Sequence, residues 1–411
     1  MKTLIVTVGV GRTIVSGILR SIEAQNPDKV VFLFTKDSKE KHGSELIEET
    51  RKRDKQVEEE MLRTEAEADR LVIDCVRIIH RWKKEGDVCI DFTFGTKAMT
   101  AALYTAGLMT GLKSASYVEG ERDPNGIVIS GSERVILMSY NLPRLIILSQ
   151  KVIHLYNSHY YGSALELAEE VVGLAGRLAD FGRKAEALYN ICSAAYAWDR
   201  FEFREAAEGV GKLLDSVEET AHLFGMDTDK ATLKKHLEDM KGYLLSLDKN
   251  PMNPSLAWEL LRNAERRAAT KRWDDAVARL YRTMEFVGQL ALSELGLFDG
   301  REYKEPPEGG LPNEIKDLLD KRMPLGLRNV YRVLFYQKHP LGRRFVGVDQ
   351  LVPEFRAVLN ARNKSILAHG LKPVDEEAYK RFGEVVEEAV GLAGIRDAAF
   401  TIPDIKAETL L

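Results

Sequence analysis

The segment from Asp87 to Met99, "DVCIDFTFGTKAM", contains the pattern that decides the fold of the first part of the chain. It opens with a nearly continuous apolar run, which is typical of a strand buried in a parallel sheet. A turn containing Gly95 follows, and it leads into "TKAMTAALYTAGLMTGL", whose apolar residues recur at helical spacing. A strand that passes into a helix in this way indicates a βαβ unit.

The same alternation extends over residues 1–140. Further strand-like runs are "TLIVTVGV" (3–10), "VVFLFTK" (30–36), "SASYVEGER" (114–122) and "GIVISGSERVILM" (126–138). The turn sequence Asp123-Pro-Asn-Gly126 is expected to close a hairpin. The sequence therefore predicts a doubly wound, Rossmann-like α/β domain. The charged segment 36–70 interrupts this pattern and is interpreted as a solvated amphipathic helix.

From about residue 141 onward the pattern is that of helices. In three places an aromatic residue is followed three positions later by alanine, and each is interpreted as the start of the second helix of a hairpin: Tyr161 and Ala164, Phe203 and Ala206, Trp273 and Ala276. "DKNPMNPSL" (248–256) separates two helical regions. We therefore predict an α/β domain over 1–140, a helical spacer over 141–250 and a second helical domain over 251–411.

The composition limits the classes of function. The 411 residues have a formal net charge of −4, so a nucleic-acid site must be a local patch rather than a property of the whole chain. No run of about 18 apolar residues occurs, and no membrane span is expected. The three cysteines form no C-x-x-C pair and there is no H-E-x-x-H, so neither a disulfide framework nor a metal site is expected. These features favour a cytoplasmic protein.

Two loops are expected at the carboxyl edge of the predicted sheet, where open α/β sheets bind ligands. They are "VGVGR" (8–12) and "DFTFGTKAM" (91–99), which together offer backbone N–H groups, two hydroxyls and one ammonium. The alternative is that the glycines only make tight turns and Thr96 only caps a helix. The spacing fits neither G-x-G-x-x-G nor a P-loop, which disfavours a dehydrogenase and an NTPase.

Near its end the chain reads "RNKSILAHG" (362–370), in which Arg362 and His369 are seven positions apart and share a helix face. RNA cleavage without a metal needs a group that transfers protons near neutral pH, which histidine supplies. It also needs a cation for the charge on the phosphate, which arginine supplies, and the amide of Asn363 can position either partner. The alternative is an ordinary helix with a solvated polar face and a glycine stop.

These motifs resemble those of a known family. The V-G that ends the first strand and the later D-x-T-x-G-T-K-x-M resemble the CARF domains of CRISPR-associated proteins. The R-x6-H of Arg362 and His369 is similar to the R-x4–6-H motif of HEPN ribonucleases. "AERRAATKRWDDAVARLYRTMEFVGQLAL" (264–292) looks like the first helical hairpin of HEPN domains in CARF–HEPN proteins.

The resemblance implies a homodimeric type III accessory ribonuclease that needs no metal or other cofactor, is activated by cyclic oligoadenylate and cleaves single-stranded RNA. It implies catalytic roles for Arg362, Asn363 and His369, with Arg282 or Glu285 as supporting residues unless these two only form an intrahelical ion pair. It also implies contacts to the cyclic oligoadenylate from these residues: Gly9, Val10, Gly11, Arg12, Thr93, Gly95, Thr96 and Lys97.

From Lys321 to Val348 the chain has no acidic residue. Candidate RNA-binding residues in this stretch are Arg328, Arg332, Lys338, Arg343 and Arg344, and the aromatic residues Tyr331, Phe335 and Tyr336 lie between them. The alternative is that the aromatic residues belong to the core. Other functions also stay open: a nucleotide-sensing or partner-binding regulator without nuclease activity, a toxin-like HEPN nuclease that binds another nucleotide, and an α/β dehydrogenase.

Overall fold

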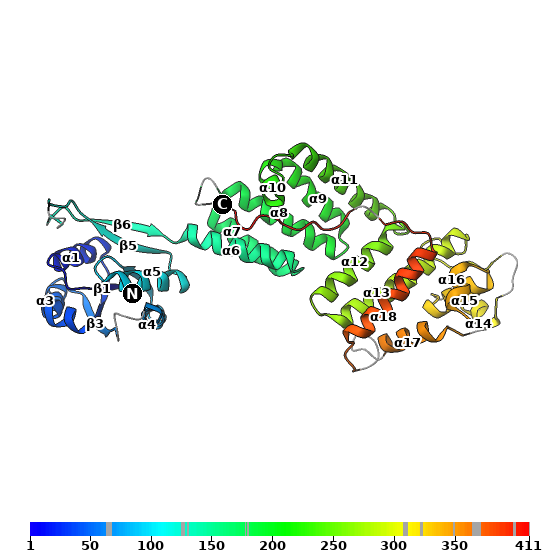
Figure 1. Ribbon diagram of the computed structural model, residues 1–411, viewed down its shortest axis with the longest axis horizontal. Helices are drawn as coiled ribbons and strands as arrows, with labels where there is room; N and C mark the ends of the chain where they lie inside the picture. Colours follow the sequence, from blue (N-terminus) through cyan, green and yellow to red (C-terminus); the bar gives the residue numbers. More distant parts are fainter. Residues whose placement is uncertain are drawn as a thin grey trace. The chain divides into compact units, whose positions relative to one another are not determined.

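The computed structural model describes residues 1–62, 68–124, 128–129, 131–176, 178, 181–306, 311–320, 324–347, 350–363, 371–397 and 400–410. It divides into two compact units, Met1–Ile147 and Leu148–Leu411, each of which is described by itself (Figure 1). The elements of the first unit are β1 (Lys2–Val8), α1 (Ile14–Gln25), β2 (Lys29–Phe34), α2 (Lys36–Ser38), the π-helix η1 (Lys39–Gly43), α3 (Ser44–Arg51), β3 (Gln56–Met61), α4 (Ala68–Lys83), β4 (Asp87–Asp91), α5 (Lys97–Met109), β5 (Ser114–Glu119) and β6 (Arg134–Ser139).

The first unit is built on a sheet whose strands, in its described part, have the order β3-β2-β1-β4-β5-β6. β1 lies between β2 and β4, and the pairs from β3 to β5 are parallel, whereas β6 is antiparallel to β5. Apolar residues cover both faces of the sheet, α1 and α3 packing on one face and α4 and α5 on the other. This confirms the predicted doubly wound α/β domain.

The interpretation of residues 36–70 as one solvated helix is wrong. The segment contains the short helices α2, η1 and α3 and then the strand β3, "QVEEEM", which pairs with β2 in parallel register. Three consecutive glutamates are tolerated in β3 because it is an edge strand, most of whose residues are exposed. Glu59 and Glu60 form ion pairs with Lys39 and Arg81, which hold the edge strand against its neighbours.

A hairpin joins the last two strands of the sheet, as the turn sequence predicted. β5 and β6 pair antiparallel from Ser114 opposite Ser139 to Glu119 opposite Arg134. Beyond the ladder, an antiparallel bridge joins Arg122 to Val128, on either side of the predicted turn, of which residues 125–127 lie outside the described part.

The regular elements in the described part of the second unit are helices, and α6 crosses the division between the units. Its elements are α6 (Asn141–Asn157), α7 (Tyr161–Ala175), α8 (Gly182–Asp199), α9 (Phe203–Asp215), α10 (Val217–Phe224), α11 (Lys230–Lys249), α12 (Ser255–Ala269), α13 (Trp273–Glu294), α14 (Asn313–Asp320), α15 (Leu327–Tyr336), α16 (Pro340–Phe345), α17 (Pro353–Asn363) and α18 (Glu376–Leu392). Within these residues no helix is both long and apolar enough to cross a membrane.

The three predicted hairpin starts are confirmed. The helices α7, α9 and α13 begin at Tyr161, Phe203 and Trp273, and the alanine three positions later in each helix is fully buried. Two residues before each aromatic residue the backbone enters the left-handed region, with φ of 63° at His159, 65° at Phe201 and 58° at Lys271. The same turn geometry therefore closes all three hairpins.

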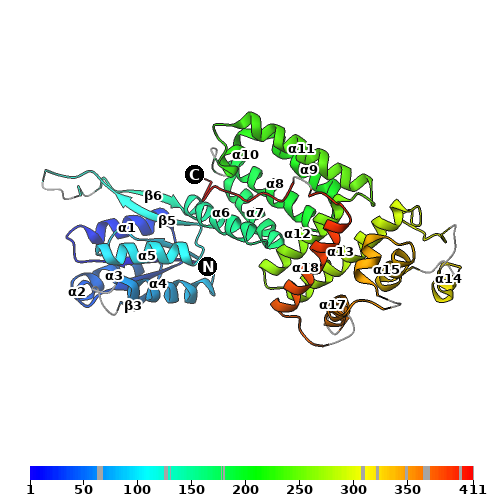
Figure 2. The same cartoon turned by 45° about the vertical axis from the view of Figure 1, so that its right-hand side comes forward.

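The last described residues form an extended segment that runs back along the helices of the second unit (Figures 1 and 2). The hydroxyl of Tyr156 donates to the Pro403 carbonyl, and Asn157 makes two reciprocal bonds with the backbone of Ile405. Ile405 and Leu410 are buried. The segment is thus packed as a strap against the helical unit.

A buried polar cluster joins the hairpin α8–α9 to α12. The carboxylate of Asp199, at the end of α8, accepts hydrogen bonds from Asn263 (2.9 Å), Arg266 (2.8 Å) and Arg267 (2.5 Å), all on α12. Next to it, the indole N–H of Trp198 donates to Glu259 over 2.6 Å. The spacer helices and the last helical region are therefore held together by buried charge as well as by apolar packing.

The left-handed turns give a stability test. Lys271→Gly is expected to raise the free energy of unfolding of the helical unit by about 1 kcal/mol, because glycine adopts positive φ without strain. The measurement is urea denaturation followed by the helical circular dichroism signal. Lys235→Gly, at an exposed position inside α11, is the matched control and is expected to lower stability by about 1 kcal/mol. A loss of stability in both variants would contradict the argument.

Candidate functional site

A cavity of about 430 Å³ opens in the first unit at the carboxyl ends of β1, β4 and β5. Six of the eight residues predicted to contact a ligand there line it: Gly9, Val10, Gly11, Thr93, Gly95 and Thr96. The two others, Arg12 and Lys97, are exposed neighbours in the chain that are not among the lining residues. The structure therefore brings together two loops that are more than 80 residues apart in the sequence.

The glycines of these loops are needed for close packing. A Cβ atom on Gly9 would lie 2.5 Å from the carbonyl oxygen of Phe94, in the opposite loop. A Cβ on Gly95 would lie 2.8 Å from the Cβ of Met99 and 2.9 Å from that of Thr7. Since real Cβ contacts are longer than this, any larger residue would push the two loops apart. The glycines thus set the width of the cavity at its base.

A buried network fixes the second loop. Asp91 is fully buried, and its carboxylate accepts hydrogen bonds from the hydroxyls of Ser21, Thr93 and Ser116 and from the backbone N–H of Thr93. Burial raises the pKa of Asp91 above its usual value, although these hydrogen bonds act in the opposite direction. The hydroxyl of Thr93 also accepts from the backbone N–H of Val118 on β5 over 2.8 Å. Thr93 therefore ties β4 to β5 at the rim of the cavity.

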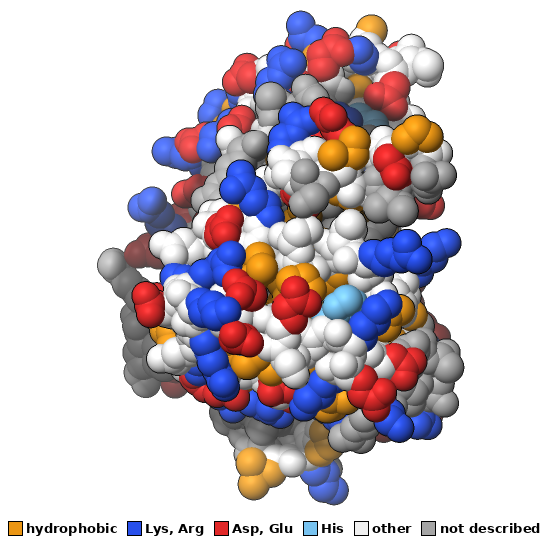
Figure 3. All heavy atoms as spheres, turned by 90° about the vertical axis from the view of Figure 1, so that its left-hand side faces the viewer, with side chains coloured by type: hydrophobic (Ala, Val, Ile, Leu, Met, Phe, Trp, Pro, Cys, Tyr) orange, Lys and Arg blue, Asp and Glu red, His pale blue; other side chains and the backbone are white. Residues whose placement is uncertain are grey.

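Two helices begin at this cavity. Ile14 starts α1, and Thr96, the N-cap of α5, accepts from the Met99 N–H while keeping its own hydroxyl proton to donate. The positive ends of both helix dipoles therefore face the cavity, which favours an anion. On the face of the molecule seen in Figure 3, basic and acidic side chains are interspersed.

The sequence analysis missed the contribution of the next strand and its hairpin. Tyr117, Glu119, Arg122 and Glu133 also line the cavity. Burial raises the pKa of Glu133, but hydrogen bonds from the backbone N–H groups of Glu133 and Gly131 and from the Ser16 hydroxyl more than offset this and lower it. The signal that could have found these residues is the position of β5 beside β4, because adjacent parallel strands end at the same edge.

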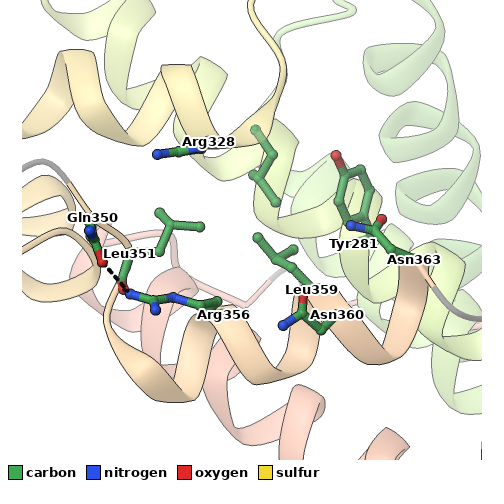
Figure 4. A pocket seen from close by; sticks show the side chains of 9 residues that line it. Tyr281, Arg328, Gln350, Leu351, Arg356, Leu359, Asn360 and Asn363 are labelled. Carbon is green, nitrogen blue, oxygen red and sulfur yellow. Dashed lines mark hydrogen bonds between the residues drawn. The ribbon is translucent and has the colours of Figure 1, made fainter.

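A second cavity, of about 450 Å³, lies in the helical unit between α13, α15 and α17 (Figure 4). Its described lining consists of two arginines, three amides, a tyrosine and three leucines: Arg328, Arg356, Gln350, Asn360, Asn363, Tyr281, Leu327, Leu351 and Leu359. This lining contains no acidic residue. Figure 4 shows Arg328 on α15 and Arg356 on α17 on opposite sides of the cavity, which is therefore positively charged.

The residues of the R-x6-H motif lie at and beyond the end of α17. Asn363, the last residue of α17, lines the cavity beside Tyr281 (Figure 4). Position 362 immediately precedes it and is rotated by about 100° around the helix axis. His369 lies outside the described residues. The structure thus places the start of the motif next to a cationic cavity.

Arg282 and Glu285, the predicted supporting residues, form an intrahelical ion pair, which was the alternative interpretation of the sequence. Arg282 donates to Glu285 over 3.2 Å and to Gln289 over 3.0 Å, and its guanidinium lies over the ring of Phe286. Their proposed part in orienting the catalytic pair stays a prediction.

The five basic residues predicted to bind RNA lie in different environments. Arg328 lines the cavity, and Lys338 and Arg343 are exposed. Arg332 is buried and pairs with Glu314, while Arg344 forms a two-pronged ion pair with Glu388. Tyr331 is fully buried and its hydroxyl donates to the Met284 carbonyl, so this ring belongs to the core and is not available to stack on RNA.

Two family models match consecutive parts of the chain. The Csm6 6H domain matches residues 149–244, and the Csm6 HEPN domain matches residues 245–392. Together they cover more than half of the chain, including α17 and the cavity beside it. The chain belongs to the Csm6 family. It is a HEPN protein of CRISPR type III systems, as the motifs suggested.

Two solved structures are similar to this Csm6-family chain. Csm6 of Enterococcus italicus bound to cyclic hexa-2'-fluoro-hexa-dAMP is 15% identical, over 96% of this chain and 93% of that chain, with a TM-score of 0.46. Can2 from Sulfobacillus thermosulfidooxidans in complex with cyclic tetra-adenylate is 12% identical, over 48% of this chain and 65% of that chain, with a TM-score of 0.25. A search of curated protein sequences gave no match.

In the described part of this Csm6-family chain, no three His, Cys, Asp or Glu residues are grouped so that they could hold a metal ion.

The packing of the two loops of the first cavity gives a second test. Gly9→Ala is expected to lower the stability of the first unit by about 1–3 kcal/mol, because its Cβ meets the backbone of Phe94. Gly11→Ala is the control in the same loop, since its Cβ meets only the flexible side chain of Ile14 at 3.2 Å. The control is expected to change stability by less than about 0.5 kcal/mol. Equal losses in thermal denaturation would contradict the close-packing argument.

Proposed function

We propose that this chain is a metal-independent endoribonuclease that cleaves single-stranded RNA in the cytoplasm as part of type III antiviral defence and is activated by cyclic oligoadenylate. The observation that carries the proposal is the R-x6-H motif of Arg362 and His369, which falls inside the HEPN match and begins at the edge of a cationic cavity. A family match gives the class of domain, and the motif and the cavity supply the groups that the reaction needs.

The proposed reaction is attack of a ribose 2′-hydroxyl on the adjacent phosphate. The oxygen–phosphorus bond to the next nucleotide breaks, which leaves a 2′,3′-cyclic phosphate and a 5′-hydroxyl. The guanidinium of Arg362 stabilises the charge that builds on the phosphate, and the imidazole of His369 transfers a proton. The amide of Asn363 positions the phosphate or the imidazole. No atom in this scheme needs to be held by a metal ion.

One Arg362–His369 pair supplies one cation and one proton-transfer group, whereas the reaction needs a proton removed from the 2′-hydroxyl and another given to the leaving oxygen. A homodimer that brings two α17 helices together would supply both. The active form is therefore proposed to be a composite site from two chains.

The cavity of the first unit is proposed to bind the activator. Helix N-termini and loop backbone face it and suit phosphates, while Tyr117 offers an aromatic ring on which a base can stack. Glu119 and Glu133 place carboxylates at the same cavity, where they can accept hydrogen bonds from the hydroxyls of ribose or the amino group of adenine. This combination fits a nucleotide better than inorganic phosphate alone.

The catalytic assignment is tested by substitution. His369→Ala is expected to reduce kcat for a fluorescent single-stranded RNA by 10²- to 10⁴-fold, because a general acid–base group contributes about that much. The rate is expected to persist in the presence of EDTA. His154→Ala, at an exposed position on α6, serves as the control and should cleave at the wild-type rate. Unchanged cleavage by the His369 variant, or loss of cleavage in EDTA, would rule out the proposed site.

Activation is tested with defined ligands. Cyclic tetra- or hexaadenylate is expected to raise the cleavage rate by about 5- to 150-fold, the range of typical coupling free energies. The linear oligoadenylate of the same length is the control. By reciprocity of binding, the factor by which the cyclic ligand raises the affinity for non-cleavable RNA should equal the factor by which that RNA raises the affinity for the cyclic ligand. Equal rates with and without both cyclic ligands would exclude activation, and absence of cleavage in every condition would favour a regulator without nuclease activity.

A further inference from the structure

We infer that the cavity between α13, α15 and α17 binds one nucleotide of the RNA substrate beside the cleaved linkage, with its phosphate held between Arg328 and Arg356. The inference rests on the proposed ribonuclease function and adds positioning residues outside the R-x6-H motif to it. It assigns a role to Arg356, which no motif in the sequence had indicated.

The charge of the cavity is the first argument. Two guanidinium groups face it, and none of its described lining residues is acidic. The side chain of Arg328 makes no ion pair or hydrogen bond with another residue in the described part of the chain. Other arginines of this domain have partners, such as Arg332 with Glu314 and Arg344 with Glu388. A cationic cavity with no carboxylate among its described lining residues is suited to an anion.

The orientation of Arg356 is the second argument. One terminal nitrogen of its guanidinium donates to the side-chain oxygen of Gln350 (3.0 Å) and to the carbonyl of Leu351 (2.9 Å). Both acceptors belong to the loop before α17, so the group is held in place (Figure 4). The guanidinium has five N–H donors, of which these bonds use two. The other three remain for a phosphate, and their orientation is set before it binds.

The third argument is the mixed character of the remaining walls. Leu327, Leu351 and Leu359 supply apolar surface, and Asn360 and Asn363 supply amides that can bond to the edge of a base. The volume of about 450 Å³ falls in the range of sites for small ligands, about 300–1,000 Å³. The cavity therefore has room for a nucleotide and groups for its phosphate and its base.

The position along α17 connects the cavity to the cleavage site. Arg356, Asn360 and Asn363 are separated by four and three residues and so lie on one face of the helix. Position 362 is rotated from this face by about 100° or more, but with a rise of about 1.5 Å per residue it lies only about 9 Å along the helix axis from Arg356. A strand whose nucleotide sits against Arg356 and Asn360 is thus led along α17 toward the start of the motif, which makes the bound nucleotide a neighbour of the cleaved linkage.

The test compares variants of the full-length protein in the presence of activator. Arg328→Ala is expected to raise KM for single-stranded RNA about tenfold with kcat within twofold of wild type, because a charged hydrogen bond to phosphate is lost from substrate binding. The slope of log KM against log salt concentration should fall by about 0.7, the value for one lost phosphate contact to a single strand. Arg356→Lys keeps the charge but not the fork of donors, and is expected to raise KM with little change in the salt slope.

Arg381→Ala is the matched control. It removes an exposed arginine of α18 that is paired with Glu377 and does not line the cavity, so KM and the salt slope should stay at their wild-type values. Arg328→Ala with unchanged KM and salt slope would overturn the inference, as would a fall in kcat alone. Thermal denaturation identifies a variant that merely fails to fold, and the Arg356→Lys result then decides.

Failure of the proposed function can be separated from failure of this inference. If the wild-type protein cleaves no RNA, the same variants are tested for binding to RNA carrying 2′-O-methyl groups, which cannot be cleaved by attack of a 2′-hydroxyl. A roughly tenfold weaker Kd for Arg328→Ala, with Arg381→Ala unchanged, would support the cavity as an RNA site even in an inactive protein. Equal Kd values for wild type and Arg328→Ala would overturn it.

Discussion

The carboxylate of Asp199 is the constraint on which the helical unit depends. It lies at the end of α8 and is enclosed by three donors from α12, of which Arg266 and Arg267 are themselves buried cations. Removing one partner from such a buried cluster leaves a charge without compensation, at about 3–5 kcal/mol. Separating the hairpin α8–α9 from α12 would therefore expose the charged groups of this cluster or leave Asp199 without its partners. This fixes the 6H region and the HEPN domain as one packed body.

The C-terminal strap also joins the 6H region to the HEPN domain. After α18 it crosses to the 6H helices, where Lys406 and Ala407 donate to the Leu223 carbonyl and Asn157 pairs with Ile405. The end of α6 is thus tied through the strap to α18, which packs against α13 and α17 in the HEPN core. The end of α6 is therefore attached to a body that is cross-linked by buried charge and backbone hydrogen bonds.

The sequence predicted the elements whose signals are local. Buried strands, helical spacing and the three aromatic–alanine hairpins are set by burial of neighbouring residues, and the structure has them where the pattern placed them. The strand β3 was missed because an edge strand with one neighbour needs little apolar surface, so "QVEEEM" has the composition of a solvated helix. Tyr331 was open to two interpretations because a basic stretch with aromatic residues has the same composition whether the rings stack on RNA or fill a core.

The same distinction between local and non-local signals holds for the candidate site. Loops at adjacent strand ends could be predicted from topology, and most of their residues line one cavity. The proposed role of Arg356 could not be predicted, because it depends on a different helix that brings Arg328 to the opposite wall and on the absence of acidic groups from the described lining. The two cavities also differ in chemistry. One combines helix N-termini, an aromatic ring and carboxylates, and the other is lined by cations and amides. A nucleotide that is recognised by its bases and hydroxyls suits the first, whereas a strand that is held by its phosphates suits the second, and this difference is what the proposed function requires of the two cavities.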